Sequence, residues 1–153
     1  MKLQILQCRH KGFAPIAWLI RWYEGTAYSH YAIGYTSEAG NYMILDATGK
    51  NVAIRSSEIF LKHYDIVNEY TVTMNYRLVD FKRWFEPHLG QSYGYMQLFG
   101  IMLRDKRLGR GWICNELVLR FIDRFFGLKN RKDIDIMGLN DTDHIVKRIA
   151  DEL

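Results

Sequence analysis

The stretch Gly111-Trp-Ile-Cys-Asn-Glu-Leu-Val-Leu-Arg120 puts a cysteine where a basic loop turns into an amphipathic helix. Apolar residues continue at helical spacing as far as Gly127, which predicts a helix that begins near Cys114 and buries one face. Backbone N–H groups in the first turn of a helix are unpaired and, together with the helix dipole, stabilise negative charge there. Cys114 is therefore a candidate nucleophile, although a place on the apolar stripe is also typical of a core cysteine.

The composition is that of one folded domain. The 153 residues are 48% hydrophobic, which is enough to bury one core, and we expect a single domain over residues 1–153. The longest apolar run, residues 13–22, is too short to span a bilayer. Because the N-terminus lacks the signal-peptide pattern and the two cysteines fit a reducing compartment, we expect a cytoplasmic location.

The net charge of +4 is unevenly distributed along the chain. Residues 104–132 carry nine basic and three acidic side chains, and this surplus surrounds Cys114. Such a surplus attracts anions, but it is also typical of a solvated surface. No nucleic-acid-binding motif accompanies the basic residues, so we expect no specific nucleic-acid partner. Peripheral membrane contact and the oligomeric state stay open.

Periodic apolar patterns predict an α+β fold with a small antiparallel sheet packed against the helix that carries Cys114. The predicted strands span residues 3–8, 29–36, 42–47, 52–55 and 65–74. The predicted helices span residues 14–23, 56–63, 78–88, 93–103 and 113–126, with a last surface helix from a cap at 141 or 142 to 153. In the second strand, His30 shares a face with Ala32 and Gly34, whose small side chains would let the Cys114 helix approach the sheet on that face.

His30, Asp46 and Cys114 form a candidate catalytic constellation. Asp46 lies on the strand after His30, and by alternation the two side chains are neighbours on one face. A cysteine at a helix start, a histidine and a carboxylate can act as nucleophile, base and orienter of the base. Spacing alone leaves open a satisfied core histidine and an aspartate that only begins the turn at residues 48–51.

The chain offers little sign of other chemistries. It contains no glycine-rich phosphate loop, and its histidines show no pair at metal-ligand spacing, so we expect neither a metal nor a cofactor. Cys8 is expected to be a core strand residue, and nothing in the spacing supports a redox pair with Cys114. The histidines are His10, His30, His63, His88 and His144.

Four short blocks resemble motifs of the circularly permuted NlpC-type papain-like proteins. Residues 28–34, YSHYAIG, resemble the family's ySHvgI strand, and residues 113–118, ICNELV, resemble its yCSELV helix start. Residues 42–47, YMILDA, resemble the viEA strand, and residues 89–94, LGQSYG, resemble the lGkpYD turn. The YiiX-like proteins are the most similar subgroup and lecithin:retinol acyltransferase is a more distant relative. The similarity covers about residues 3–126.

The resemblance implies a permuted papain-like fold and a cysteine peptidase or amidase that works through an acyl-enzyme. Cys114 would be the nucleophile, His30 the base and Asp46 the orienter, while Tyr93 would help to position the substrate. Peptides or peptidoglycan stems would be the substrates. A lipid-directed acyltransferase or thioesterase that takes acyl-lipids at the same site, and a binding module without turnover, remain as alternatives.

The chain departs from the family motifs at three positions. Asn115 stands where the family has a small hydroxyl residue, Asp46 where it has a longer glutamate, and Gly94 where it has an aspartate. These departures leave the third site residue and the substrate pocket open.

Overall fold

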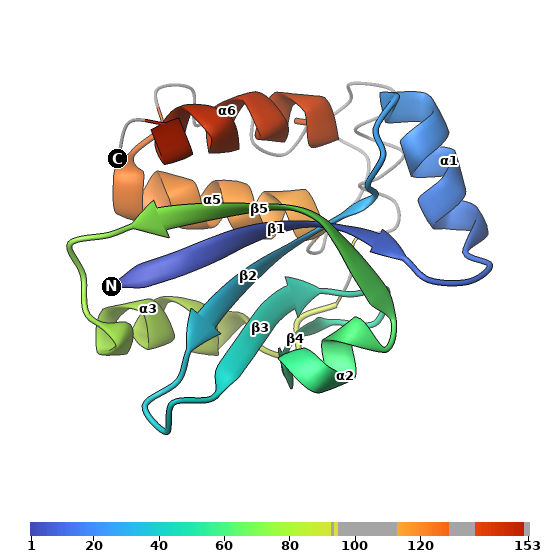
Figure 1. Cartoon of the computed structure of the whole chain (residues 1–153). Helices are drawn as coiled ribbons and strands as arrows, with labels where there is room; N and C mark the ends of the chain where they lie inside the picture. The colour runs from blue at the N-terminus through green and yellow to red at the C-terminus, as the bar shows by residue number, and fades with distance from the viewer. Residues whose placement is uncertain (93, 95–112, 129–136, 152–153) are drawn as a thin grey trace.

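In the computed structural model, which describes residues 1–92, 94, 113–128 and 137–151, five antiparallel strands form one sheet (Figure 1). The strands are β1 (Lys2–His10), β2 (His30–Thr36), β3 (Tyr42–Ala47), β4 (Val52–Ser56) and β5 (Tyr64–Thr73). Their order across the sheet is β4-β3-β2-β1-β5, so the N-terminal strand lies inside the sheet. The α+β class and the antiparallel sheet predicted from the sequence are therefore confirmed.

The described helices pack around this sheet. They are α1 (Pro15–Glu24), α2 (Ser57–Leu61), α3 (Leu78–Phe85) with the 3-10 turn η1 (Glu86–His88), α5 (Cys114–Phe126) and α6 (Leu139–Asp151). The helix predicted over residues 93–103 lies outside the described residues. Among the helices that the structure describes, none has the length and apolar content needed to cross a bilayer.

Two predicted helix boundaries are wrong for local reasons. The helix predicted to reach residue 88 changes to a 3-10 turn after Phe85, because Pro87 has no N–H with which to continue the i→i−4 hydrogen bonds of an α-helix. The last helix begins at Leu139, ahead of its predicted cap. The carboxylate of Asp141 accepts a 2.9 Å hydrogen bond from the Gly138 N–H, so Asp141 caps the helix from inside the first turn.

The two faces of the sheet carry separate hydrophobic cores. In β2, Tyr31 and Ile33 belong to the larger core, which the sheet forms with α3, α5 and α6. Ala32 belongs to a smaller core that lies against Phe60 of α2. Figure 1 accordingly shows α5 and α6 on one side of the sheet and α2 on the other. The fully buried residues that α5 adds to the larger core are Leu117, Val118, Leu119, Phe121 and Ile122.

The expectation that α5 packs on the face of His30, Ala32 and Gly34 is wrong. The helix lies on the opposite face, where bulky side chains such as Tyr31 fill the space between helix and sheet. Gly34 instead makes room for a neighbour within the sheet, because a Cβ atom at this position would lie 2.0 Å from Tyr42 Oη. The small residue serves strand packing and not helix approach.

The buried side-chain amide of Gln7 links α6 to the sheet by hydrogen bonds. Gln7 of β1 is fully buried, and its Nε2 donates to Tyr31 Oη at 2.8 Å and to Asp143 Oδ1 of α6 at 2.7 Å. Its Oε1 accepts from Asn68 Nδ2 of β5 at 2.7 Å. Because both amide donors and the acceptor are satisfied, the network joins three strands and a helix without the cost of an unpaired buried polar group.

The close approach at Gly34 predicts a specific packing cost. We expect Gly34→Ala to lower the free energy of unfolding by about 1–3 kcal/mol, which is typical of overpacking. Chemical denaturation measures the change. In a Tyr42→Ala background the same substitution should cost almost nothing, because the obstructing ring is gone. An undiminished cost in that background would show that Tyr42 is not the obstacle.

Candidate functional site

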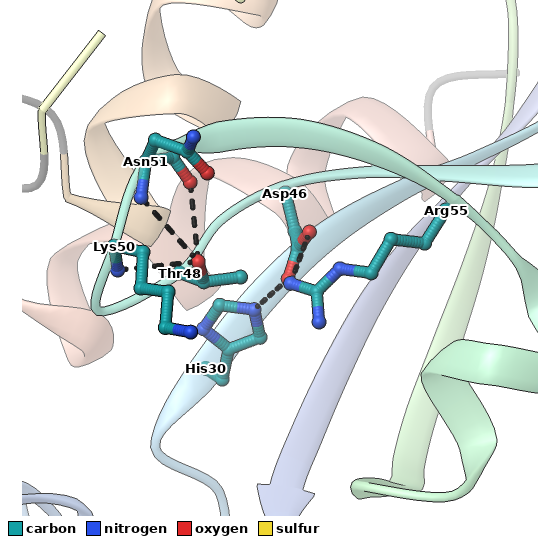
Figure 2. A network of polar contacts seen from close by, with 6 residues as sticks. All are labelled: His30, Asp46, Thr48, Lys50, Asn51 and Arg55. Carbon is teal, nitrogen blue, oxygen red and sulfur yellow. Dashed lines mark hydrogen bonds and ion pairs between the residues drawn. The ribbon is translucent and has the colours of Figure 1, made fainter. Parts of the chain in front are cut away.

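A buried chain of polar contacts links three neighbouring strands (Figure 2). His30 Nε2 lies 2.9 Å from Asp46 Oδ2, and Arg55 Nη2 lies 2.9 Å from each oxygen of the same carboxylate. The strand register explains these contacts, since Asp46 pairs with Ala32 and with Ala53 and is thus the diagonal neighbour of His30 and Arg55 on one face. Asp46 has no exposed surface, so both partners hold a fully desolvated carboxylate.

Cys114, the candidate nucleophile, lies beside these polar contacts at the end of the sheet. Cys114 is the first residue of α5 and His30 is the first residue of β2, and the Cys114 side chain lies near enough to His30 to affect the pKa of its imidazole. The helix therefore reaches His30 although it packs on the opposite face of the sheet. Nε2 of His30 faces Asp46, which leaves Nδ1 as the ring nitrogen for the thiol. Cys114 is 3% exposed and His30 is 6% exposed.

The surroundings of His30 favour its protonated form. Burial alone lowers the pKa of an imidazole, but the hydrogen bond with Asp46, the nearby thiol of Cys114 and the charges on these two groups outweigh burial and raise the pKa of His30 from 6.5 to about 9. The raised pKa favours the imidazolium form of this ring, which lies between the Asp46 carboxylate and the Cys114 sulfur. Such a cation stabilises a thiolate beside it.

Stacked aromatic rings cover one face of the imidazole. The ring centroids of Tyr64 and His30 lie 4.7 Å apart at an interplanar angle of 19°. Phe60 stacks on Tyr64 in turn, with ring centroids 4.7 Å apart and an interplanar angle of 17°. Burial, with the charges of Asp46 and Cys114, raises the pKa of the Tyr64 phenol, so it stays neutral. The stack restrains the plane of the imidazole and keeps water from that face.

Arg55 and Tyr64 are site residues that the sequence reasoning missed. Alternation along the hairpin of β3 and β4 could have placed Arg55 on the face of Asp46, because residues 53 and 55 share that face once the register is known. For Tyr64 no comparable signal exists, since its contact with His30 depends on the pairing of the start of β5 with the end of β1.

Cys8 lies beside the site, but its thiol is expected to be unreactive. It is fully buried, as expected for a core residue, and pairs with His30 in the register of β1 and β2. Burial, followed by the charges of Asp46 and Cys114, raises the pKa of its thiol. Thiolate is the reactive form of cysteine, so Cys8 is expected to be inert in the folded protein.

The remaining site predictions have separate outcomes. Tyr93 lies outside the described residues. Asn115, which departs from the family motif, is buried and donates from Nδ2 to the carbonyl oxygen of Met137 at 2.5 Å, so it anchors the chain that precedes α6. In the part of the chain that the structure describes, no cluster of three or more His, Cys, Asp or Glu side chains could hold a metal ion.

Comparison with known proteins adds no assignment, because no protein-family model and no curated protein matches the chain. What the site can do follows from its own chemistry.

The ion pair of Asp46 with Arg55 predicts a large stability effect. Removing one partner of a buried pair costs about 3–5 kcal/mol, and because His30 still contacts the carboxylate we expect about 3 kcal/mol for Arg55→Met. Chemical denaturation provides the measurement. Arg9→Met is the matched control, because it removes an arginine from a solvent-exposed ion pair. The Arg9 side chain is half exposed, and its Nη2 lies 3.6 Å from Asp65 Oδ2. Equal losses in the two variants would contradict the assigned role of Arg55.

The raised pKa of His30 predicts how stability depends on pH. The folded pKa of about 9 exceeds the ordinary value of 6.5, so protonation of His30 stabilises the fold fully below pH 6.5, and this contribution disappears as the pH rises through 9. We expect the difference in unfolding free energy between the wild type and His30→Gln to shrink over that interval. Denaturation curves at several pH values test this, and a constant difference would refute it.

Proposed function

We propose that the protein is a cysteine hydrolase of the permuted NlpC papain-like type, a peptidase or amidase that works through an acyl-enzyme. The observation that carries the proposal is the juxtaposition of Cys114 with His30, whose Nε2 is hydrogen-bonded to the buried carboxylate of Asp46. The order of these residues in the chain agrees with the permuted arrangement, in which the histidine strand precedes the cysteine helix.

The first half-reaction forms a thioester. His30 takes the proton of the Cys114 thiol, and the sulfur attacks the amide carbon to form a C–S bond. Negative charge develops on the carbonyl oxygen, where backbone N–H groups at the start of α5 can donate hydrogen bonds. His30 then gives its proton to the leaving nitrogen, the C–N bond breaks, and the acyl group stays on the sulfur.

The second half-reaction returns the free enzyme. His30 accepts a proton from water as the water oxygen attacks the thioester carbon. The C–S bond breaks, the carboxylic acid leaves, and the proton goes back to the His30 and Cys114 pair. Throughout both steps Asp46 holds Nε2 of His30, so that Nδ1 stays directed at the sulfur, and Arg55 keeps the carboxylate in place.

A lipid-directed acyltransferase or thioesterase is the second candidate. It uses the same residues and differs in the leaving group, which is an alcohol or a thiol and not an amine. The exposed aromatic helix α1 favours it, because this helix could bring the site to a lipid substrate. Mass spectrometry of acyl-Cys114, trapped after incubation with a peptidoglycan-stem peptide or with an acyl thioester, distinguishes the two candidates.

The proposal predicts a reactive thiol that depends on His30. We expect iodoacetamide, a reagent small enough for a thiol that is 3% exposed, to modify Cys114 at neutral pH faster than a model thiol. His30→Ala should lower the rate at least about tenfold, because the imidazolium that stabilises the thiolate is lost. Peptide mass spectrometry measures both rates.

Cys8 is the internal control for this experiment, since its fully buried thiol should remain unmodified in the native protein. If Cys114 reacts no faster than the model thiol and His30→Ala leaves the rate unchanged, the hydrolase proposal fails. A binding module that keeps the fold without turnover is then the better description.

A further inference from the structure

The helix α1 presents most of its large apolar side chains to solvent. An amphipathic helix on a protein surface normally buries its apolar stripe, yet none of the residues of α1 is buried. Trp18 is 60% exposed and Trp22 is 69% exposed, while Phe13, just before the helix, is 93% exposed. The side chains of Arg21 and Glu24 lie on the partly covered side, together with Ile20, which packs against the larger core.

Polar contacts hold this orientation. The carboxylate of Glu24 accepts a hydrogen bond from the Asn140 N–H, and the Asn140 side chain donates to the Glu24 carbonyl oxygen. The carboxylate also lies so close to Gly138 that a Cβ atom there would be 2.1 Å from it. Figure 1 shows α1 beside the start of α6 and away from the sheet. The end of α1 is thus attached to the start of α6 while its apolar face points outward.

The exposed apolar side chains form a continuous strip. Trp18 and Trp22 are four residues apart, as are Leu19 and Tyr23, so each pair lies one above the other on the helix. The two pairs are adjacent around the helix axis, and Ile16 extends the strip on the side of Tyr23. All five are exposed. A contiguous apolar strip on a surface marks a binding site, unlike single exposed hydrophobic residues.

The charges around the strip are mainly basic. Residues 9–25 contain Arg9, Lys11 and Arg21 and one acid, Glu24, which faces Asn140. Asp65 of β5 pairs with Arg9 and Lys11, whereas Arg21 forms no ion pair among the described residues. A hollow of about 260 Å³ between α1 and the preceding loop is lined by Arg21 and His10 together with Phe13 and Trp18. His10 Nδ1 is buried and has no hydrogen-bond partner among the described residues. Cationic and polar groups therefore lie beside exposed aromatic rings.

We propose that α1 and Phe13 form a docking surface for an anionic phospholipid bilayer. Tryptophan and tyrosine prefer the boundary between lipid headgroups and acyl chains, and a helix with such a face lies in the plane of that boundary. Arg21, beside the strip, then meets lipid phosphates. A second copy of the chain fits less well, because pairing of two α1 strips brings their basic borders together. The docking surface does not include Cys114 or His30.

Sedimentation with vesicles tests the proposal on the full chain. We expect the protein to bind vesicles of equimolar phosphatidylcholine and phosphatidylserine, and Trp18→Ser/Trp22→Ser to weaken the partition coefficient at least about tenfold. Arg21→Gln should weaken it about fivefold, because one juxtamembrane cation is lost. Ile59→Ser/Leu61→Ser removes two exposed apolar side chains of α2 and serves as the matched control, with unchanged binding expected.

Three results would overturn the proposal. They are no binding to the anionic vesicles, full binding by the double tryptophan variant, and a wild-type dimer without lipid that the same variant abolishes. The last result assigns the strip to a second copy of the chain. Cys114→Ala separates this proposal from the proposed hydrolase activity, because it should bind vesicles like the wild type whatever the outcome of the thiol experiments.

Discussion

The fully desolvated carboxylate of Asp46 is the constraint on which the candidate site depends. A charge without solvent contact is tolerated only with close partners of opposite charge or with hydrogen-bond donors. His30 and Arg55 supply both from the neighbouring strands. The same carboxylate helps to raise the pKa of His30 and so favours an imidazolium beside Cys114. The Asp46 carboxylate thus affects both the stability of the sheet and the chemistry of the Cys114 sulfur.

The end of the sheet is where the elements needed for chemistry meet. β2 and α5 both begin there, and the aromatic stack of Tyr64 and Phe60 closes one face of His30. Beside it, the pairing of β1 with β5 shifts register between Gln7 and Cys8, a bulge of the kind that redirects strands next to functional sites. His30, Asp46 and Arg55 lie on the face of the smaller core, and the opposite face of the sheet is left to the larger core.

The site buries a charged group, whereas α1 exposes large apolar side chains. At the site a carboxylate is buried and fully partnered, whereas in α1 two tryptophans are exposed and the one carboxylate of the helix is used for attachment to α6. Both arrangements depart from the usual placement of polar groups outside and apolar groups inside, as functional sites often do. A lipid-docked α1 offers a physical reason for its orientation.

The sequence by itself determined the strands and most helices of the fold, because alternation and helical spacing report local burial. It also indicated His30, Asp46 and Cys114 as a set, through short motifs and the alternation of two adjacent strands. Only the tertiary structure decided that α5 lies on the face opposite His30, that Arg55 and Tyr64 join the site, and that α1 turns outward. Periodicity shows that a helix or strand has an apolar face, but which partner that face meets depends on contacts between residues far apart in the chain.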